Sequence, residues 1–255
     1  MFSFQEKKFE KFAKDPEKKV QLEKHNVRYL MRVYPSGFRV NSSNFDPIGF
    51  WRRGVQMVAL NWQTYDLGLQ INEAMFASEE DRGGYVLKPK ELRGSRATFD
   101  PPADTNAATL TKNKKVTTFS VEIISAQQLP KPKDHRDKGL HPFVVVEVFS
   151  ADDKAKDKSV AEGGIGVDSS DAKGISGLGA PQKRRTNVVK DDGFHPLFRE
   201  KMVFKVTTKF EELAFVRFSV YNADDGDSSD RTLIATYTAK LLSLQQGNIS
   251  LKAPH

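Results

Sequence analysis

The spacing of apolar residues changes once along this chain, close to residue 94. Before that point, short apolar runs alternate with segments whose apolar residues recur at helical spacing, as in a parallel α/β unit. After it, apolar and polar residues alternate in short runs at regular intervals, which is typical of a β-sandwich. The sequence therefore predicts an α/β part over residues 1–93, a linker over 94–112 and an all-β part over 113–255.

The α/β part is expected to contain three strands and three helices. The strands are the end of one at Met1 to Phe4, one that runs through Tyr34, and the continuous apolar run Val55 to Leu60. The helices are Lys7 to Leu22 with a break at Asp15-Pro16, Pro47 to Arg53 opened by Asp46, and Leu67 to Phe76. A proline at the first helical position is a typical helix start.

The strand that stops at Pro35 carries candidate chemistry. Strand alternation places Arg28, Leu30, Arg32 and Tyr34 on one face, and Val27, Tyr29, Met31 and Val33 on the other. The first face ends in a guanidinium beside a phenol. An arginine fork suits a phosphate, and a tyrosine ring suits the apolar side of a sugar. An arginine at a strand end is also commonly part of a surface ion pair, so both interpretations remain open.

Five strands are expected in the all-β part. They are Val116 to Ile124, with Phe119, Val121 and Ile123 on one face, then Phe143 to Phe149, Met202 to Val206, Val216 to Val220 and Leu233 to Tyr237. Residues 150–182 interrupt this pattern, because they are rich in Gly, Asp, Lys and Ser and hold few large apolar side chains. Such a segment buries too little surface to offset its ordering entropy, so we expect a flexible insertion in a loop of the sandwich.

Composition and charge limit the class of protein further. The 255 residues contain no cysteine, which excludes disulfides and thiolate metal sites and fits a reducing cytosol. No apolar run approaches the length that spans a bilayer, and the mean hydropathy is −0.54. The net charge of +7 is spread along the chain in short basic clusters, which favours anionic lipid surfaces. Nucleic acid is disfavoured as a partner, since no nucleic-acid module accompanies the charge. We therefore expect a cytoplasmic protein that lies peripherally at membranes.

A longer set of motifs surrounds the strand end at Pro35. Arg32-Val33-Tyr34-Pro35-Ser36-Gly37-Phe38-Arg39-Val40-Asn41-Ser42-Ser43-Asn44 is followed by Phe50-Trp51, Gln56 to Thr64 and Gly83 to Pro89. From about Ser3 to Arg93 the chain resembles, at the family's spacing, the last part of the catalytic barrel of eukaryotic, fungal-like phosphoinositide-specific phospholipase C. The resemblance implies the C-terminal portion of a (β/α)8 barrel. Only about three of the eight strands are accounted for, so an open sheet edge is expected.

The resemblance assigns binding roles to particular residues. It implies that Ser3 and Arg32 contact phosphates of an inositol headgroup. It also implies that Tyr34 stacks on the inositol ring and that Phe38, on the barrel rim, dips into the bilayer. Gln5 departs from the serine that is usual there, so the alignment at Ser3 is weaker than the alignment at Arg32.

The catalytic groups of the family are expected to be absent from this chain. In the family, two histidines supply acid–base chemistry and carboxylates hold a catalytic calcium ion, and these groups come mainly from the first half of the barrel. The chain has five histidines, none of which matches a catalytic one: His25, His135, His141, His195 and His255. The resemblance therefore implies a chain that is inactive alone and needs the missing N-terminal barrel half.

The all-β part resembles the membrane-binding C2 sandwich that follows the barrel in the same phospholipases. The matching segments are Ile123 to Pro130, Asp192 to Pro196, Leu213 to Phe218 and Ser243 to Gly247. Calcium-binding members of this module collect several Asp side chains in loops at one end, because a hard cation needs many oxygen ligands. In this chain Asp191, Asp192 and Asp224 are weak candidates, while His141 and Asn222 stand where Asp is usual. We expect weak or absent calcium binding by the sandwich.

Two functions remain open from the sequence. The first is the C-terminal part of a phosphoinositide phospholipase C, a family that hydrolyses phosphatidylinositol 4,5-bisphosphate to diacylglycerol and inositol trisphosphate in signalling. The second is a non-catalytic C2 module that binds anionic phospholipids. Both imply phosphoinositides and anionic membranes as partners, and they differ in whether the missing barrel half is supplied.

Overall fold

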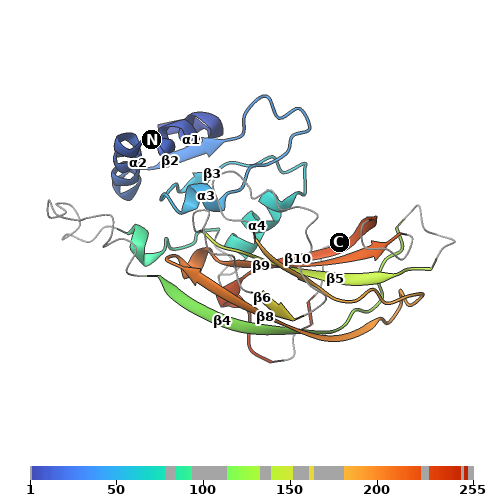
Figure 1. Ribbon diagram of the computed structural model, residues 1–255. Coiled ribbons are helices and arrows are strands. Elements are labelled where there is room, and N and C mark those ends of the chain that lie inside the picture. The colour runs from blue at the N-terminus through green and yellow to red at the C-terminus, as the bar shows by residue number, and fades with distance from the viewer. Residues whose placement is uncertain are drawn as a thin grey trace.

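The computed structural model describes residues 2–77, 84–93, 114–132, 139–151, 161–163, 181–224, 230–247 and 250–251. Within these ranges, a small α/β part lies against a two-layer β part (Figure 1). The α/β part holds a three-stranded parallel sheet, and the β part holds two antiparallel sheets. The predicted fold class, parallel α/β followed by an antiparallel sandwich, is confirmed. The predicted linker over 94–112 lies outside the described residues.

The α/β part begins with a strand, and its later strands are separated by helices. Its elements are β1 (Phe2–Gln5), α1 (Glu6–Lys14), α2 (Pro16–Arg28), β2 (Met31–Tyr34), α3 (Ile48–Trp51), β3 (Met57–Val58), α4 (Leu67–Phe76) and the 3-10 helix η1 (Lys90–Leu92). The strands lie in the order β1-β2-β3. Spatial order therefore follows chain order, as it does in consecutive units of a parallel barrel.

One face of this sheet is apolar and covered. Met31 and Val33 of β2 are 1% and 0% exposed and pack in a cluster with Phe9 of α1. Arg32 and Tyr34 point to the other face, which is exposed. The alternation predicted from the sequence is confirmed within β2.

The boundary between α2 and β2 corrects the sequence prediction. The predicted strand faces include Val27 and Arg28, but α2 continues to Arg28. The last turn of this helix is held in place because Asn26, which is fully buried, donates a hydrogen bond from Nδ2 to the carbonyl of Arg53 at 2.9 Å. A long-range contact of this kind overrides the local apolar pattern.

The third strand is shorter than its apolar run suggests. Residues Val55 to Leu60 form one continuous run, but only Met57 and Val58 belong to β3, where they pair with Arg32 and Val33. The partner strand β2 stops before Pro35, which has no N–H group to extend the ladder.

The β part contains all five strands that the alternation predicts, with two further strands. They are β4 (Lys115–Ser125), β5 (Pro142–Phe149), β6 (Ala161–Gly163), β7 (Gln182–Arg185), β8 (Leu197–Thr208), β9 (Phe215–Ala223) and β10 (Arg231–Lys240), with short 3-10 helices η4 (Glu211–Leu213) and η5 (Leu241–Ser243). One sheet has the order β10-β9-β5-β7 and the other β4-β8-β6. The core between them includes Val146, Val148, Met202, Phe204 and Val216.

Two short strands modify the insertion predicted over residues 150–182. Ala161–Gly163 form β6, which pairs antiparallel with β8, and Gln182 begins β7 on the edge of β5. These residues of the predicted insertion form strands rather than loop, because pairing with an edge strand uses backbone groups and needs few apolar side chains. Residues 152–160 and 164–180 lie outside the described part.

An apolar interface joins the two parts of the chain. Trp51 of α3 and Ile71 of α4 cluster with Phe149 of β5 and Phe215 of β9. The ring centroids of Trp51 and Phe215 are 6.1 Å apart. Figure 1 shows α4 directly against the sheet that contains β9 and β10. The α/β part therefore has a second buried apolar surface, besides the one that covers its sheet. This second surface packs against the outer face of the sandwich.

A polar layer continues this interface along the same sheet. The carboxylate of Glu147, 5% exposed, pairs with Lys183 at 2.9 Å and Arg217 at 3.0 Å. Arg217 Nε also donates to Thr236 Oγ1 at 3.2 Å, and Thr236 Oγ1 donates to Gln70 Oε1 of α4 at 3.5 Å. Hydrogen bonds thus link α4 to the strands on which it packs.

Asp46 is a buried acid at the start of α3. Its Oδ1 accepts the N–H of Ile48 at 2.9 Å, and the residue is 7% exposed. Burial raises the pKa of this carboxyl to about 7, although the hydrogen bond from Ile48 and the charge of Arg52 act in the opposite direction. Asp46 therefore takes up a proton on folding in mildly acidic solution.

We predict that Asp46→Asn removes a pH dependence of stability. An acid with a raised folded-state pKa binds more protons when folded, so stability falls as the pH rises from the usual 3.8 to about 7. Asp46 should contribute a loss on the order of 3 kcal/mol across this range. Asp46→Asn keeps an acceptor oxygen and should lose much less. Urea unfolding followed by Trp51 fluorescence in a Trp62→Phe background measures the difference.

The matched control is Asp15→Asn. Asp15 accepts the N–H groups of Glu17 and Lys18 at the start of α2, but it is solvent-exposed. Its hydrogen bond from Lys18 lowers its pKa, so its contribution to stability is lost only at more acidic pH. The prediction would be contradicted if the free energy of unfolding changed equally with pH in the unmodified chain and in Asp46→Asn.

Candidate functional site

Ser3, Arg32 and Tyr34 lie together at the ends of two neighbouring strands. Because β1 and β2 are parallel, their carboxyl ends meet at the same edge of the sheet, and Ser3 lies directly opposite Arg32. Arg32 Nη1 donates a hydrogen bond to Ser3 Oγ at 3.5 Å. The guanidinium carbon of Arg32 is 5.2 Å from the centre of the Tyr34 ring. The structure therefore brings together the three residues that the resemblance assigns to headgroup binding.

This cluster presents a cation, a hydroxyl and an aromatic face to solvent. Arg32 and Ser3 are exposed, and Tyr34 is 36% exposed. A guanidinium binds phosphate through parallel N–H bonds, and a serine hydroxyl can donate a further one. The tyrosine ring provides a flat surface beside them. Such a set can bind a phosphorylated ring but contains no acid–base pair.

The described histidines lie elsewhere in the structure. His25 belongs to α2, where its ring is edge-on to that of Phe2 with centroids 4.8 Å apart. His141 accepts the N–H of Asp191 on Nδ1 at 3.1 Å, and His195 also lies in the sandwich. None of these three contacts Arg32. His135 and His255 fall outside the described residues.

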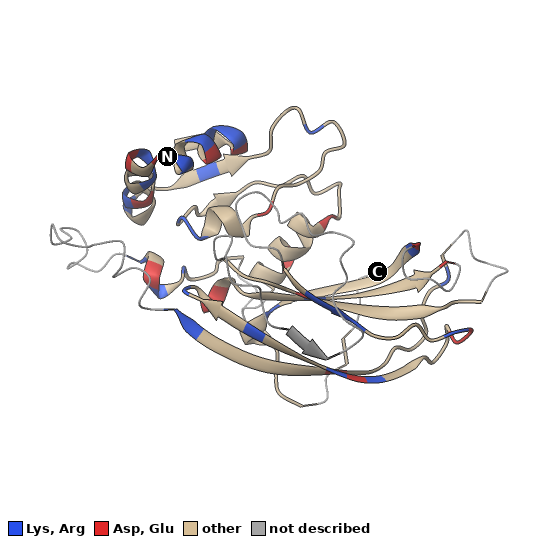
Figure 2. Cartoon of the chain, in the orientation of Figure 1, with Lys and Arg blue, Asp and Glu red and all other residues tan. Residues whose placement is uncertain are grey.

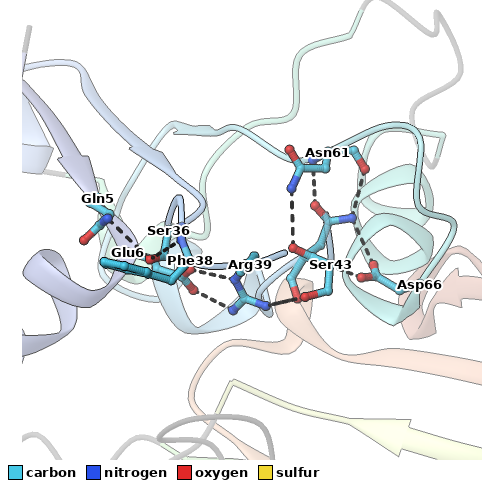
Figure 3. A network of polar contacts seen from close by, with 9 residues as sticks. Gln5, Glu6, Ser36, Phe38, Arg39, Ser43, Asn61 and Asp66 are labelled. Atoms are coloured by element: carbon cyan, nitrogen blue, oxygen red, sulfur yellow. Dashed lines mark hydrogen bonds and ion pairs between the residues drawn. The ribbon is translucent and has the colours of Figure 1, made fainter. Parts of the chain in front are cut away.

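A buried carboxylate holds the loop that follows Tyr34 (Figure 3). Glu6, the first residue of α1, is 3% exposed. Its Oε1 accepts the N–H of Ser36 and the Nε of Arg39, and its Oε2 accepts the Nη2 of Arg39, all at 2.7 Å. Burial alone would raise the pKa of Glu6, but the hydrogen bonds from Arg39 and Ser36 outweigh it and hold the pKa below its usual value. Glu6 is therefore an ionised link between the end of β1 and the loop after β2.

The same loop is bonded to the segment that follows β3. Arg39 Nη1 donates to Ser43 Oγ and to the carbonyl of Asn44, both at 3.1 Å. Asn44 donates from its backbone N–H to Asp66 Oδ2 at 2.6 Å and from Nδ2 to Asp66 Oδ1 at 3.0 Å. The N–H of Asn61 donates to Asn44 Oδ1 at 2.6 Å. Figure 3 shows these contacts as one network. We call it the polar belt, defined by Glu6, Ser36, Arg39, Ser43, Asn44, Asn61 and Asp66.

Large apolar side chains project from the two loops that the polar belt joins. Phe38 is 84% exposed, Val40 92% and Trp62 67%. Lys7 Nζ of α1 lies 5.6 Å from the centre of the Phe38 ring. These exposed apolar side chains form a candidate interaction surface, with the cation of Lys7 beside Phe38. No helix in the described part of the chain is long and apolar enough to cross a bilayer.

The loops considered for calcium are closed by hydrogen bonds. Asp224 accepts Asn222 Nδ2 on Oδ1 and Thr232 Oγ1 on Oδ2, both at 2.8 Å. Asn222 Oδ1 in turn accepts the N–H of His141 at 2.7 Å. Both carboxylate oxygens of Asp224 are thus directed at protein donors.

The remaining calcium candidates do not join Asp224 in a ligand set. Asp191 has a side chain that is 80% exposed, and Asp192 accepts the N–H of His195 at 3.0 Å. Among the residues that the structure describes, no three His, Asp or Glu side chains are grouped so as to hold a metal ion. The described donor set therefore does not fit calcium, which needs six to eight oxygen ligands.

Comparison with known protein families assigns both parts of the chain. Residues 1–91 match the family described as Phosphatidylinositol-specific phospholipase C, Y domain, and residues 117–164 and 177–252 match the C2 domain. The chain therefore contains the Y domain of phosphatidylinositol-specific phospholipase C followed by a C2 domain. The predicted family is confirmed, with its Y domain and C2 domain in the expected order.

Two fungal enzymes and one solved structure match this chain over almost its whole length. It is 41% identical over 254 residues to 1-phosphatidylinositol 4,5-bisphosphate phosphodiesterase 1 of Candida albicans, covering 96% of the chain and 22% of that protein. It is 35% identical to the enzyme of the same name from Saccharomyces cerevisiae, covering 96% of the chain and 27% of that protein. The crystal structure of S. officinalis PLC21 matches 95% of the chain with a TM-score of 0.64 and 26% identity, over 26% of its own length. The chain thus spans about a quarter of these relatives.

The polar belt is the part of the site that the sequence does not reveal. Glu6 and Arg39 are separated by 33 residues, and each resembles an ordinary surface charge when the sequence is read locally. The available signal is weak: Glu6 directly follows a strand, and Arg39 lies in the loop that directly follows the next one. The exposure of Val40 and Trp62 is likewise visible only in the folded chain.

We predict that Asp224 stabilises the sandwich without calcium. Asp224→Ala removes the acceptor of Asn222 and Thr232 and should cost about 1 to 2 kcal/mol. The loss should be the same in EDTA and in millimolar calcium, because both carboxylate oxygens already accept hydrogen bonds from protein donors. Thermal unfolding followed by circular dichroism measures it.

Asp192→Ala serves as the control, because Asp192 is a second calcium candidate with a single hydrogen bond in a partly exposed loop. Its effect should be smaller and equally independent of calcium. A calcium-dependent rise in the unfolding temperature that either substitution abolishes would show that these loops bind the ion.

Proposed function

We propose that this chain is the headgroup-binding and membrane-docking part of a phosphoinositide phospholipase C that hydrolyses phosphatidylinositol 4,5-bisphosphate to diacylglycerol and inositol trisphosphate. The observation that carries the proposal is the cluster of Ser3, Arg32 and Tyr34 at the strand ends of a Y domain. The substrate is the one printed in the names of the Candida albicans and Saccharomyces cerevisiae relatives. In this proposal the chain alone is inactive, and the acid–base groups and the catalytic calcium ligands come from the preceding half of the barrel.

The chemistry of the cluster supports binding of a phosphorylated inositol. Arg32 would form charge-assisted hydrogen bonds with a ring phosphate, with Ser3 as a second donor beside it. Tyr34 would cover the ring's apolar face and exclude water from one side. These groups would orient the phosphodiester toward the other barrel half. They would thus contribute to the reaction rate through positioning rather than through proton transfer.

The open edge of β1 supports docking of that missing half. Within the described strands, β1 pairs only with β2, so its other edge is free for a further strand. Beside it lies a groove of about 360 Å³, lined by Phe2, Phe4, Phe12, Lys18, Gln21, Leu22, His25 and Met31. An unpaired edge next to an apolar groove is a template for another strand and helix. The proposed occupant is a strand–helix unit of the other barrel half.

Charge and exposed apolar groups support a peripheral position on anionic membranes. Lys and Arg side chains are distributed over α1, α2 and the strands of the sandwich (Figure 2). Phe38, Val40 and Trp62 provide apolar groups at the rim next to the headgroup cluster. Apolar insertion combined with attraction to anionic lipid is the usual basis of peripheral binding.

We predict that supplying the missing barrel half restores hydrolysis and makes it depend on Arg32. The purified chain should show no hydrolysis of phosphatidylinositol 4,5-bisphosphate above background. Co-expression with the missing barrel half, taken from the Candida albicans relative, should produce hydrolysis. Arg32→Ala should then lower kcat/KM about a hundredfold, because a bound phosphate loses charge-assisted hydrogen bonds of about 1.5 to 3 kcal/mol.

Arg28→Ala is the matched control, since Arg28 is an exposed arginine at the opposite end of β2 from the cluster. Its kinetics should match those of the unmodified complex. Activity that is unchanged in Arg32→Ala would remove Arg32 from the site. A stable complex without any activity would favour the alternative function, a non-catalytic module that binds anionic phospholipids.

We also predict that vesicle binding depends on lipid charge and salt more than on calcium. Co-sedimentation should rise with the fraction of phosphatidylserine and fall with added salt, because screening weakens attraction between basic side chains and the lipid surface. Exchanging EDTA for calcium should change it little. Strict dependence on calcium would contradict the closed arrangement of Asp224 with Asn222 and Thr232.

A further inference from the structure

We propose that Glu6 is a positioning residue that fixes Phe38 for insertion into the lipid surface. This inference rests on the proposed membrane function and goes beyond it by assigning that function a residue that is itself buried. Glu6 has no route to lipid, since it is 3% exposed. It acts through Arg39 and Ser36, which lie on either side of Phe38 in the loop after β2.

The first step of the argument is the geometry of the loop. Glu6 holds Ser36 through its backbone N–H and Arg39 through two guanidinium nitrogens, with all three distances at 2.7 Å. These anchors flank Gly37 and Phe38, so two of the four residues are fixed and the two between them project outward. Phe38 donates its own N–H to Ser36 Oγ at 3.4 Å, which adds a contact at its base.

The second step is the energetic state of Phe38. An 84% exposed phenylalanine gains free energy by folding back onto apolar surface, so an unrestrained loop would bury it. The contacts of Glu6 oppose this collapse because they fix the backbone of Ser36 on one side of the ring and the guanidinium of Arg39 on the other. The ring therefore stays available to lipid. The entropic cost of ordering it arises during folding and not during binding.

The third step is the direct neighbourhood of Glu6. Lys7, the next residue of α1, has its Nζ 5.6 Å from the centre of the Phe38 ring. The carboxylate thus fixes the loop against the same helix turn that provides a cation. An apolar ring with an adjacent ammonium group is complementary to an anionic lipid surface, where the ring enters the acyl region and the cation meets headgroups.

A double-mutant cycle with Phe38 tests this assignment. Binding of the full 255-residue chain to phosphatidylcholine vesicles with a fixed fraction of phosphatidylserine is measured by co-sedimentation. Phe38→Ala should weaken partitioning about fivefold, through loss of buried apolar area. Glu6→Gln should weaken it about threefold. The double substitution should bind like Phe38→Ala alone, because Glu6 acts only through the ring.

Two further variants separate positioning from general stability. Glu23→Gln breaks another ion pair of the α/β part, with Arg53 at 3.3 Å, and should leave partitioning unchanged. Arg39→Lys keeps the charge but loses the two-nitrogen contact, so it should have a smaller effect that is also absent in the Phe38→Ala background. Arg39→Lys replaces Glu6→Gln in the cycle if circular dichroism shows that Glu6→Gln does not fold.

Hydrogen exchange supplies a readout that does not involve lipid. Amides of residues 36–43 should exchange faster in Glu6→Gln, while those of β4 should be unchanged. An additive cycle, in which Glu6→Gln and Phe38→Ala weaken binding independently, would overturn the inference and leave the proposed membrane function intact. A Phe38→Ala chain that binds vesicles normally would overturn the membrane contact at Phe38 and the inference with it.

Discussion

The parallel pairing of β1 with β2 is the constraint on which the candidate site depends. It brings Ser3 and Arg32 opposite each other, although helices α1 and α2 separate them along the chain. The register is set by Met31 and Val33, because both must face the apolar cluster that contains Phe9. A shift of one residue would exchange the two faces of β2 and carry Arg32 into that cluster. The position of Arg32, the side chain proposed to bind phosphate, is thus determined by the burial of its two apolar neighbours.

A second constraint is the ion pair between Glu6 and Arg39, which is partly shielded from water. Burying Glu6 against the partly exposed Arg39 is unfavourable unless their donors and acceptors are satisfied, and removing one partner of a fully buried pair commonly costs about 3 to 5 kcal/mol. The polar belt satisfies them through backbone groups of the loops as well as through each other. Loops have few apolar side chains with which to pack, so hydrogen bonds determine their shape. Here they hold a surface in which Phe38 and Val40 remain exposed.

Local patterns predict some of this architecture and miss the rest for physical reasons. The helix Leu67–Phe76 and the alternating strand around Phe119 follow from periodicity, which depends only on near neighbours. Arg32 and Tyr34 could be identified because they lie in one short strand whose motif resembles a known family. The Glu6–Arg39 pair could not, since it forms between segments whose proximity depends on sheet register. The end of α2 was also missed, because a distant carbonyl, that of Arg53, anchors its last turn.

The interface between the two parts gives the sandwich a structural role besides the proposed lipid binding. Trp51 and Ile71 belong to the α/β part, yet they share a cluster with Phe149 and Phe215 of the sandwich. Without the sandwich these side chains would be exposed, in a unit whose parallel sheet has an edge at β1 that pairs with no other described strand. Large buried apolar side chains commonly contribute about 1.5 to 3 kcal/mol each, so this loss is comparable with the net stability of a small domain. The sandwich therefore stabilises the sheet that positions Arg32, and the proposed headgroup site depends on a surface far from it in sequence.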